Sequence, residues 1–100
     1  MQTLSLEDKR KKLTNSIPGL VIRAKQEKWC VYEDHCLLRL IYDYIFLDDW
    51  RKHVKSPAYK HLNNTQLNRA LSLIDKMQTC DKHYISLLQF ASLRFRGKIN

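Results

Sequence analysis

The chain has 100 residues, of which 44% are hydrophobic and 28% are charged, and its formal net charge is +8. This composition is typical of one globular domain spanning residues 1–100, and it argues against an intrinsically disordered chain. The sequence contains only two glycines and two prolines. Because the tight turns of a β-sheet protein need such residues, an all-α fold is favoured.

The charge is sorted into three blocks along the chain. Residues 1–28 have a net charge of +4, residues 29–50 of −4, and residues 51–100 of +8. Two basic ends therefore flank an acidic and strongly apolar middle. Such a pattern either presents positive surface to a negatively charged partner or pairs the middle with the ends inside the domain.

The N-terminal part predicts two short helices. Ser5 and Asp8 are spaced as a capping box, which predicts a basic helix to about residue 15 within the segment 1–17, polar enough to fray. The Pro-Gly pair that starts at Pro18 is expected to end this helix. Proline is tolerated at the first helical position, so a second short helix is predicted from Pro18 to about Trp29.

The strongest predicted helix covers residues 33–47. Its apolar residues recur at helical spacing over much of its circumference, so we expect it at the centre of a bundle. Glu33 and Asp34 fall in its first turn, where carboxylates are favoured. Asp48 or Asp49 is predicted to cap a short helix over residues 49–54.

Three further segments complete the predicted bundle. Ser56 and Pro57 resemble a cap and a first-position proline that lead into residues 58–62, and Asn63 with Gln66 forms a second capping box for a helix to about residue 78. A last helix follows Asp81 and ends at Gly97, with Tyr84, Leu87, Leu88, Ala91 and Phe95 facing inward. The prediction is a compact bundle of four or five short helices, whose buried core includes Leu40, Ile41, Tyr44, Leu71, Ile74, Leu88 and Ala91.

Metal binding is a weak alternative. The spacing of Cys80 and His83 is one that zinc ligands use, and Cys30 and Cys36 could complete a tetrahedral site. These two cysteines lack the tight C-x-x-C loop, however, and a cysteine on an apolar helix usually packs as a small hydrophobe. We assign no metal or cofactor, and the sequence leaves open whether these four residues form a metal site.

Catalysis is also not expected. The chain has no glycine-rich phosphate loop, and His35 beside Cys36 does not form a nucleophile–base pair because adjacent helical residues point about 100° apart. The N-terminus has no signal-peptide core, no apolar run could cross a membrane, and three cysteines without an export signal are most simply reduced. We therefore expect a non-enzymatic cytoplasmic protein.

The leading hypothesis is a small basic module that contacts RNA or DNA electrostatically, for example as a small subunit of a ribonucleoprotein. The alternative is an adaptor or inhibitor that docks on an acidic partner protein. The sequence does not fix the oligomeric state or any sequence preference. The candidate contact residues are basic or could stack on bases: Lys9, Arg10, Lys11, Lys12, Arg23, Lys25, Trp50, Arg51, Lys52, Lys55, Tyr59, Arg94, Arg96 and Lys98.

The stretch from Glu33 to Leu67, together with the terminal SLRFRGK, resembles a family of short bacterial proteins of unknown function. The resemblance covers about residues 30–98, and some members carry an acetyltransferase-related label. Such enzymes bind coenzyme A through a glycine-bearing loop on an α/β sheet. This chain has neither those glycines nor obvious strands, so the resemblance implies a compact helical domain and the label is not carried over.

Overall fold

Four α-helices and two short 3₁₀ helices form the part of the chain that the computed structural model describes, residues 4–98. The elements are α1 (Leu6–Gln26), α2 (Asp34–Phe46), η1 (Trp50–Lys52), η2 (Ala58–Lys60), α3 (Asn64–Met77) and α4 (Lys82–Phe95). No strand occurs among these residues. The predicted all-α bundle of short helices is therefore confirmed.

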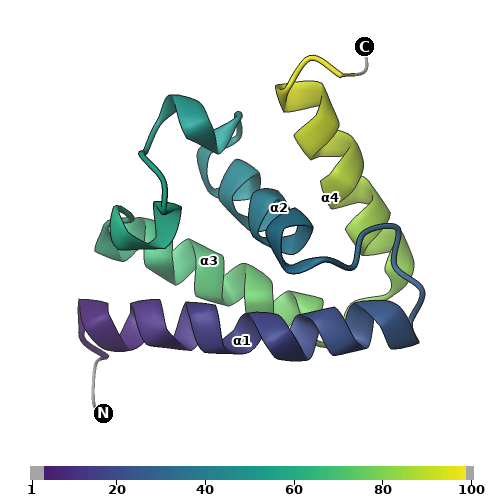
Figure 1. The fold of residues 1–100 in the computed structure, drawn as a ribbon, viewed down its shortest axis with the longest axis horizontal. Helices are drawn as coiled ribbons and strands as arrows, with labels where there is room; N and C mark the ends of the chain where they lie inside the picture. Colours follow the sequence, from purple (N-terminus) through teal and green to yellow (C-terminus); the bar gives the residue numbers. More distant parts are fainter. Residues whose placement is uncertain (1–3, 99–100) are drawn as a thin grey trace.

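Helix α2 is the centre of the bundle, as its apolar circumference predicts. It packs against α1, α3 and α4, while α1 and α3 run side by side along one edge of the molecule (Figure 1). Leu37, Leu40 and Ile41 are fully buried. The side chains that they meet come from all three neighbouring helices, so one contiguous core holds the described residues together.

The expected break at Pro18 is wrong, because α1 runs through it as one helix of 21 residues. Leu13, Ile17, Leu20 and Ala24 form a single buried stripe on both sides of the proline. Burying each large apolar side chain is worth about 1.5–3 kcal/mol. A proline inside a helix costs about 3 kcal/mol relative to alanine, so the continuous stripe outweighs it.

Most of the predicted caps are present. Ser5 accepts a hydrogen bond from Asp8 N, Asn63 and Gln66 form the capping box of α3, and Asp81 accepts from His83 N and Tyr84 N. Asp49 caps η1 by accepting from Arg51 N. Ser56 is not the cap of the next segment, since Pro57 occupies that position with no side-chain hydrogen bond and the segment forms only the three-residue η2.

Helix α4 buries a different face from the predicted one, because a buried polar cluster lies between α2 and α4. Asp43 of α2 is fully buried, and its Oδ2 accepts hydrogen bonds from Ser92 Oγ at 2.6 Å and Arg96 Nε at 2.9 Å. These partners require Ser92 to face inward together with Ile85 and Leu88. The prediction that Leu87 faces inward is wrong, because its side chain is 68% exposed.

The predicted core is otherwise largely correct. Leu40, Ile41, Ile74 and Leu88 are buried. Tyr44, Leu71 and Ala91 are only half-buried and lie at the edge of the core. Several residues complete the core beyond those predicted, including Leu13, Leu20, Trp29, Leu62 and Met77.

Candidate functional site

Arg10 brings two distant basic segments together. From the N-terminal half of α1, its Nε donates to the carbonyl oxygen of Tyr59 at 3.2 Å and its Nη2 donates to that of Leu62 at 3.3 Å. These hydrogen bonds fasten α1 to η2 across about fifty positions of sequence. The first basic block of the chain therefore lies against part of the third.

A hollow of about 500 Å³ lies at this junction, and we refer to it as the basic hollow. Its lining is Glu7, Arg10, Lys11, Thr14, Tyr59 and Lys60. Glu7 is the single carboxylate of the lining, and it is already paired with Arg10 Nη1 at 3.3 Å. Lys11 and Lys60 are exposed and form no ion pair within residues 4–98. The hollow therefore carries a net positive charge that faces solvent.

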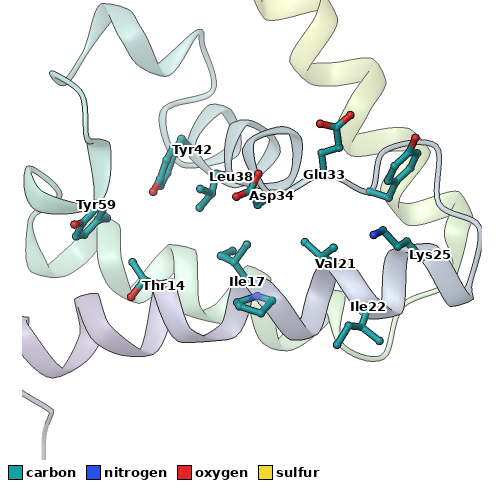
Figure 2. Close-up of a pocket in the computed structure, with 12 residues that line it drawn as sticks. Thr14, Ile17, Val21, Ile22, Lys25, Glu33, Asp34, Leu38, Tyr42 and Tyr59 are labelled. Atoms are coloured by element: carbon teal, nitrogen blue, oxygen red, sulfur yellow. The ribbon is translucent and has the colours of Figure 1, made fainter.

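A second, larger hollow of about 640 Å³ continues along α1, and we refer to it as the α1–α2 groove. Its lining is Thr14, Ile17, Pro18, Val21, Ile22, Lys25, Tyr32, Glu33, Asp34, Leu38, Tyr42 and Tyr59. Figure 2 shows Ile17 and Val21 of α1 pointing toward Leu38 and Asp34 of α2. Thr14 and Tyr59 line both hollows, so the basic hollow and the groove are adjacent.

Two polar groups at the Thr14 end of the groove have capacity for a hydrogen bond. Tyr42 is only 5% exposed and lines the groove, but its hydroxyl oxygen is not fully buried: within residues 4–98 the fully buried side-chain polar atom without a partner is Trp29 Nε1. Burial, with a smaller contribution from Tyr59, raises the pKa of Tyr42 to about 12, so the hydroxyl is protonated near neutrality. Pro18 has no N–H, and the carbonyl of Thr14 four residues earlier therefore lacks its usual helical donor.

The other end of the groove is acidic. Glu33 and Asp34 stand at the start of α2, and the Nδ1 atom of His35 lies within 3.7 Å of Glu33 and 3.5 Å of Asp34. Lys25 of α1 lies on the facing wall (Figure 2). The groove therefore runs from a cationic end at η2, through an apolar middle, to an end with two carboxylates and one ammonium group.

Several of the sequence-predicted contact residues have internal partners instead. Lys9 is 7% exposed and its Nζ donates to Asn64 Oδ1. Arg23 donates to the carbonyl oxygens of Met77 at 3.3 Å and Cys80 at 2.7 Å, at the C-terminal end of α3. These side chains brace the helices, so they are not free to meet a partner.

Arg96 is held inside the molecule, and Arg51, although exposed, is paired with a carboxylate of the chain. The side chain of Arg96 is 11% exposed and forms ion pairs with Asp43 at 2.9 Å and with Asp49 at 3.4 Å. Arg51 binds the same Asp49 through Nε and Nη2, which lowers the pKa of Asp49 to about 2. The acidic middle of the chain thus neutralises part of the basic C-terminal block.

The remaining predicted residues divide between the hollow and the rest of the surface. Arg10, Lys11 and Tyr59 line the basic hollow, and Lys25 lines the groove. Trp50 is half-buried against Tyr42, with ring centroids 5.5 Å apart. The other residues of the set are exposed and line neither hollow: Lys12, Lys52, Lys55, Arg94 and Lys98.

Sequence reasoning missed Thr14, Leu38 and Tyr42 as site residues. Leu38 and Tyr42 widen the apolar stripe of α2, and that pattern predicts core residues rather than the wall of a groove. A usable signal lies on α1, where Thr14, Val21 and Lys25 share a second stripe beside the buried one. That signal becomes visible only if α1 is taken as one helix through Pro18.

The cysteines are all free thiols. Cys30 is exposed, while Cys36 and Cys80 are half-buried, and burial raises the pKa of the Cys80 thiol. Within residues 4–98, no three His, Cys, Asp or Glu side chains are grouped so that they could hold a metal ion. No helix of this part of the chain combines the length and the apolar character that crossing a membrane requires.

Comparison of the chain with protein-family models, with curated proteins and with solved structures finds no match.

Proposed function

We propose that this protein is a small, non-enzymatic binding module for single-stranded RNA or DNA, and that the basic hollow holds the phosphates of the strand. The observation that carries the proposal is the attachment of Arg10 to the carbonyls of Tyr59 and Leu62. It sets Lys11 and Lys60 around one hollow of about 500 Å³. Two ammonium groups on flexible stems around a common space suit successive phosphates of a flexible strand.

Two exposed lysines close in sequence to the lining residues add positive charge to the same segments. Lys12 follows Lys11 on the exposed side of α1, and Lys55 precedes η2. Each phosphate that these groups neutralise releases counterions, so binding should depend strongly on salt. A role as a small subunit of a ribonucleoprotein belongs to the same proposal. So does a cytoplasmic location, since free thiols are typical of reducing compartments.

The test is the binding of a mixed-sequence single-stranded oligonucleotide to folded, nuclease-treated protein, measured by fluorescence anisotropy over a range of salt concentrations. The informative variant is Lys11→Gln with Lys60→Gln. The matched control is Lys28→Gln with Lys82→Gln, because these lysines are exposed but line neither hollow. Both variants lower the net charge of the protein equally. A difference between their affinities for the oligonucleotide therefore depends on where the lysines lie and not on the net charge.

We expect the hollow variant to bind at least about fivefold more weakly than the control variant at physiological salt. The slope of log affinity against log salt should flatten by about 1.4, because each phosphate that a lysine neutralises on a single strand adds about 0.7 to the slope. Equal weakening in the two variants would contradict the proposal, as would no binding by the original protein at low salt. Displacement of the oligonucleotide by polyglutamate at equal charge concentration would favour an acidic protein partner instead.

A further inference from the structure

We infer that the α1–α2 groove is a base pocket: it receives one nucleobase of a strand whose phosphates lie in the basic hollow. The inference rests on the proposed function and adds a subsite to it. It turns a purely electrostatic surface into one that also distinguishes a strand with bases from one without them.

The adjacency of the two hollows is the first support. Thr14 and Tyr59 line both of them, so a group held at Lys11 and Lys60 is next to the mouth of the groove. In a nucleic acid strand the base is attached to the sugar beside its phosphate. A strand that follows the basic hollow can therefore place a base in the groove without leaving the phosphate site.

The shape and lining of the groove are the second support. Its volume of about 640 Å³ lies within the roughly 300–1,000 Å³ of small-molecule sites, which are mainly apolar with a few polar groups. Ile17, Val21 and Leu38 form its apolar walls, and Tyr42 and Tyr59 add two aromatic rings (Figure 2). Aromatic side chains bind single-stranded bases by stacking on their flat faces.

The unpartnered polar groups are the third support. The hydroxyl of Tyr42 is a protonated donor in a side chain 5% exposed, and the Thr14 carbonyl is an acceptor without its helical donor. The Tyr42 hydroxyl oxygen is not fully buried, so a base in the groove would replace solvent as its hydrogen-bond partner. Nucleobase edges carry both N–H donors and nitrogen or oxygen acceptors, so a base has the chemistry to satisfy both groups.

The charges orient the strand. Glu33 and Asp34 lie at the far end of the groove, where they face the single ammonium group of Lys25. Phosphates are disfavoured beside two carboxylates and favoured beside Lys11 and Lys60. The backbone therefore stays on the η2 side, and only a base enters the groove.

The experiment compares two strands of equal length, oligodeoxyadenylate and a fully abasic deoxyribose-phosphate strand. Both strands carry the same number of phosphates, so the ratio of their affinities measures the contribution of the bases to binding. We expect the original protein to bind the adenylate strand on the order of tenfold more tightly, as stacking of one base on an aromatic side chain would give. Val21→Trp, which fills the groove, should bring the ratio near one while leaving the abasic affinity and its salt slope unchanged.

Three controls make the result decisive. Leu87→Trp adds the same ring at an exposed position of α4 outside the groove, and it should keep the ratio. Tyr42→Phe removes only the unpartnered hydroxyl, and it should lower the ratio severalfold in a protein with unchanged circular dichroism. Tyr44→Phe makes the same change on α2 at a residue that does not line the groove, and it should lower nothing.

The outcomes separate this inference from the function on which it rests. If the original protein binds both strands equally, or if Val21→Trp and Tyr42→Phe both keep the ratio of the original, the base pocket is wrong and phosphate binding stands. Loss of abasic binding in Val21→Trp would also overturn the pocket, because the groove would then act on the phosphates. If neither strand binds the original protein at low salt, the proposed function itself fails.

Discussion

Arg96, just beyond the end of α4, binds Asp43 in the middle of α2 through two nitrogens, with Nε 2.9 Å from Oδ2 and Nη2 3.3 Å from Oδ1. The same carboxylate accepts hydrogen bonds from Ser92 Oγ and from the backbone N–H of Trp50. One buried side chain thereby connects α2, α4 and η1. It explains why a basic residue of the last block has little contact with solvent.

The first prediction concerns this pair. Arg96→Ala should destabilise the fold by about 3–5 kcal/mol, because it leaves the buried carboxylate of Asp43 without its ionic partner. Urea denaturation followed by circular dichroism measures the change. Arg94→Ala, two residues earlier and exposed, is the matched control and should change stability by less than about 0.5 kcal/mol. Similar losses for the two variants would show that the ion pair contributes little.

The second prediction separates the centre of the core from its edge. Leu40→Ala should cost about 2–5 kcal/mol, since Leu40 is 1% exposed and its removal leaves a cavity. Leu71 is only half-buried at the edge of the core, so the same change there should cost less than at Leu40. Equal losses in the free energy of unfolding would contradict this difference, because they would indicate that Leu71 is as fully buried as Leu40.

The third prediction concerns the proline inside α1. Pro18→Ala should stabilise the protein by about 1–3 kcal/mol, because the helix regains the hydrogen bond to the Thr14 carbonyl and the cost of an internal proline disappears. The added freedom of the unfolded chain offsets part of this gain. A fall in the urea midpoint of Pro18→Ala would show instead that the proline ring supports the fold.

The fourth prediction follows from the raised pKa of Tyr42. Its pKa is about 12 in the folded protein against 10.0 for the ordinary side chain, so the unfolded chain loses this proton first as the pH rises. The contribution of the neutral phenol to stability is complete below pH 10 and declines between pH 10 and 12. The free energy of unfolding of Tyr42→Phe should therefore fall less steeply with pH than that of the original protein. Parallel curves would contradict the raised pKa.

The helices could be predicted from the sequence because their signals are local. Capping residues such as Asn63 and Asp81 act within three residues, and the apolar repeat of α2 spans its whole length. Pro18 misled the prediction because its local cost is opposed by a buried stripe whose partners lie on other helices. A local rule cannot weigh contacts with chain that is distant in sequence.

The candidate site was less predictable for the same reason. The sequence marked Lys11 and Tyr59 as candidates, but it could not show that Arg10 joins their two segments through backbone carbonyls. From the sequence alone, every basic residue counted as equally available to a partner. Whether a charge faces solvent, like Arg94, or a buried carboxylate, like Arg96, depends on the face that α4 presents to α2.

Four arginines of this protein differ in position from nearly all of its lysines. Arg10, Arg23, Arg39 and Arg96 all reach carbonyls, hydroxyls, amides or carboxylates of neighbouring elements, whereas the lysines other than Lys9 lie on the exposed surface. Acetylation modifies lysine and not arginine, and it removes the positive charge. Acetylation of the surface lysines would therefore remove most of the positive charge of the exposed surface, where Arg51, Arg69 and Arg94 would remain, while the arginine contacts between the helices stay intact.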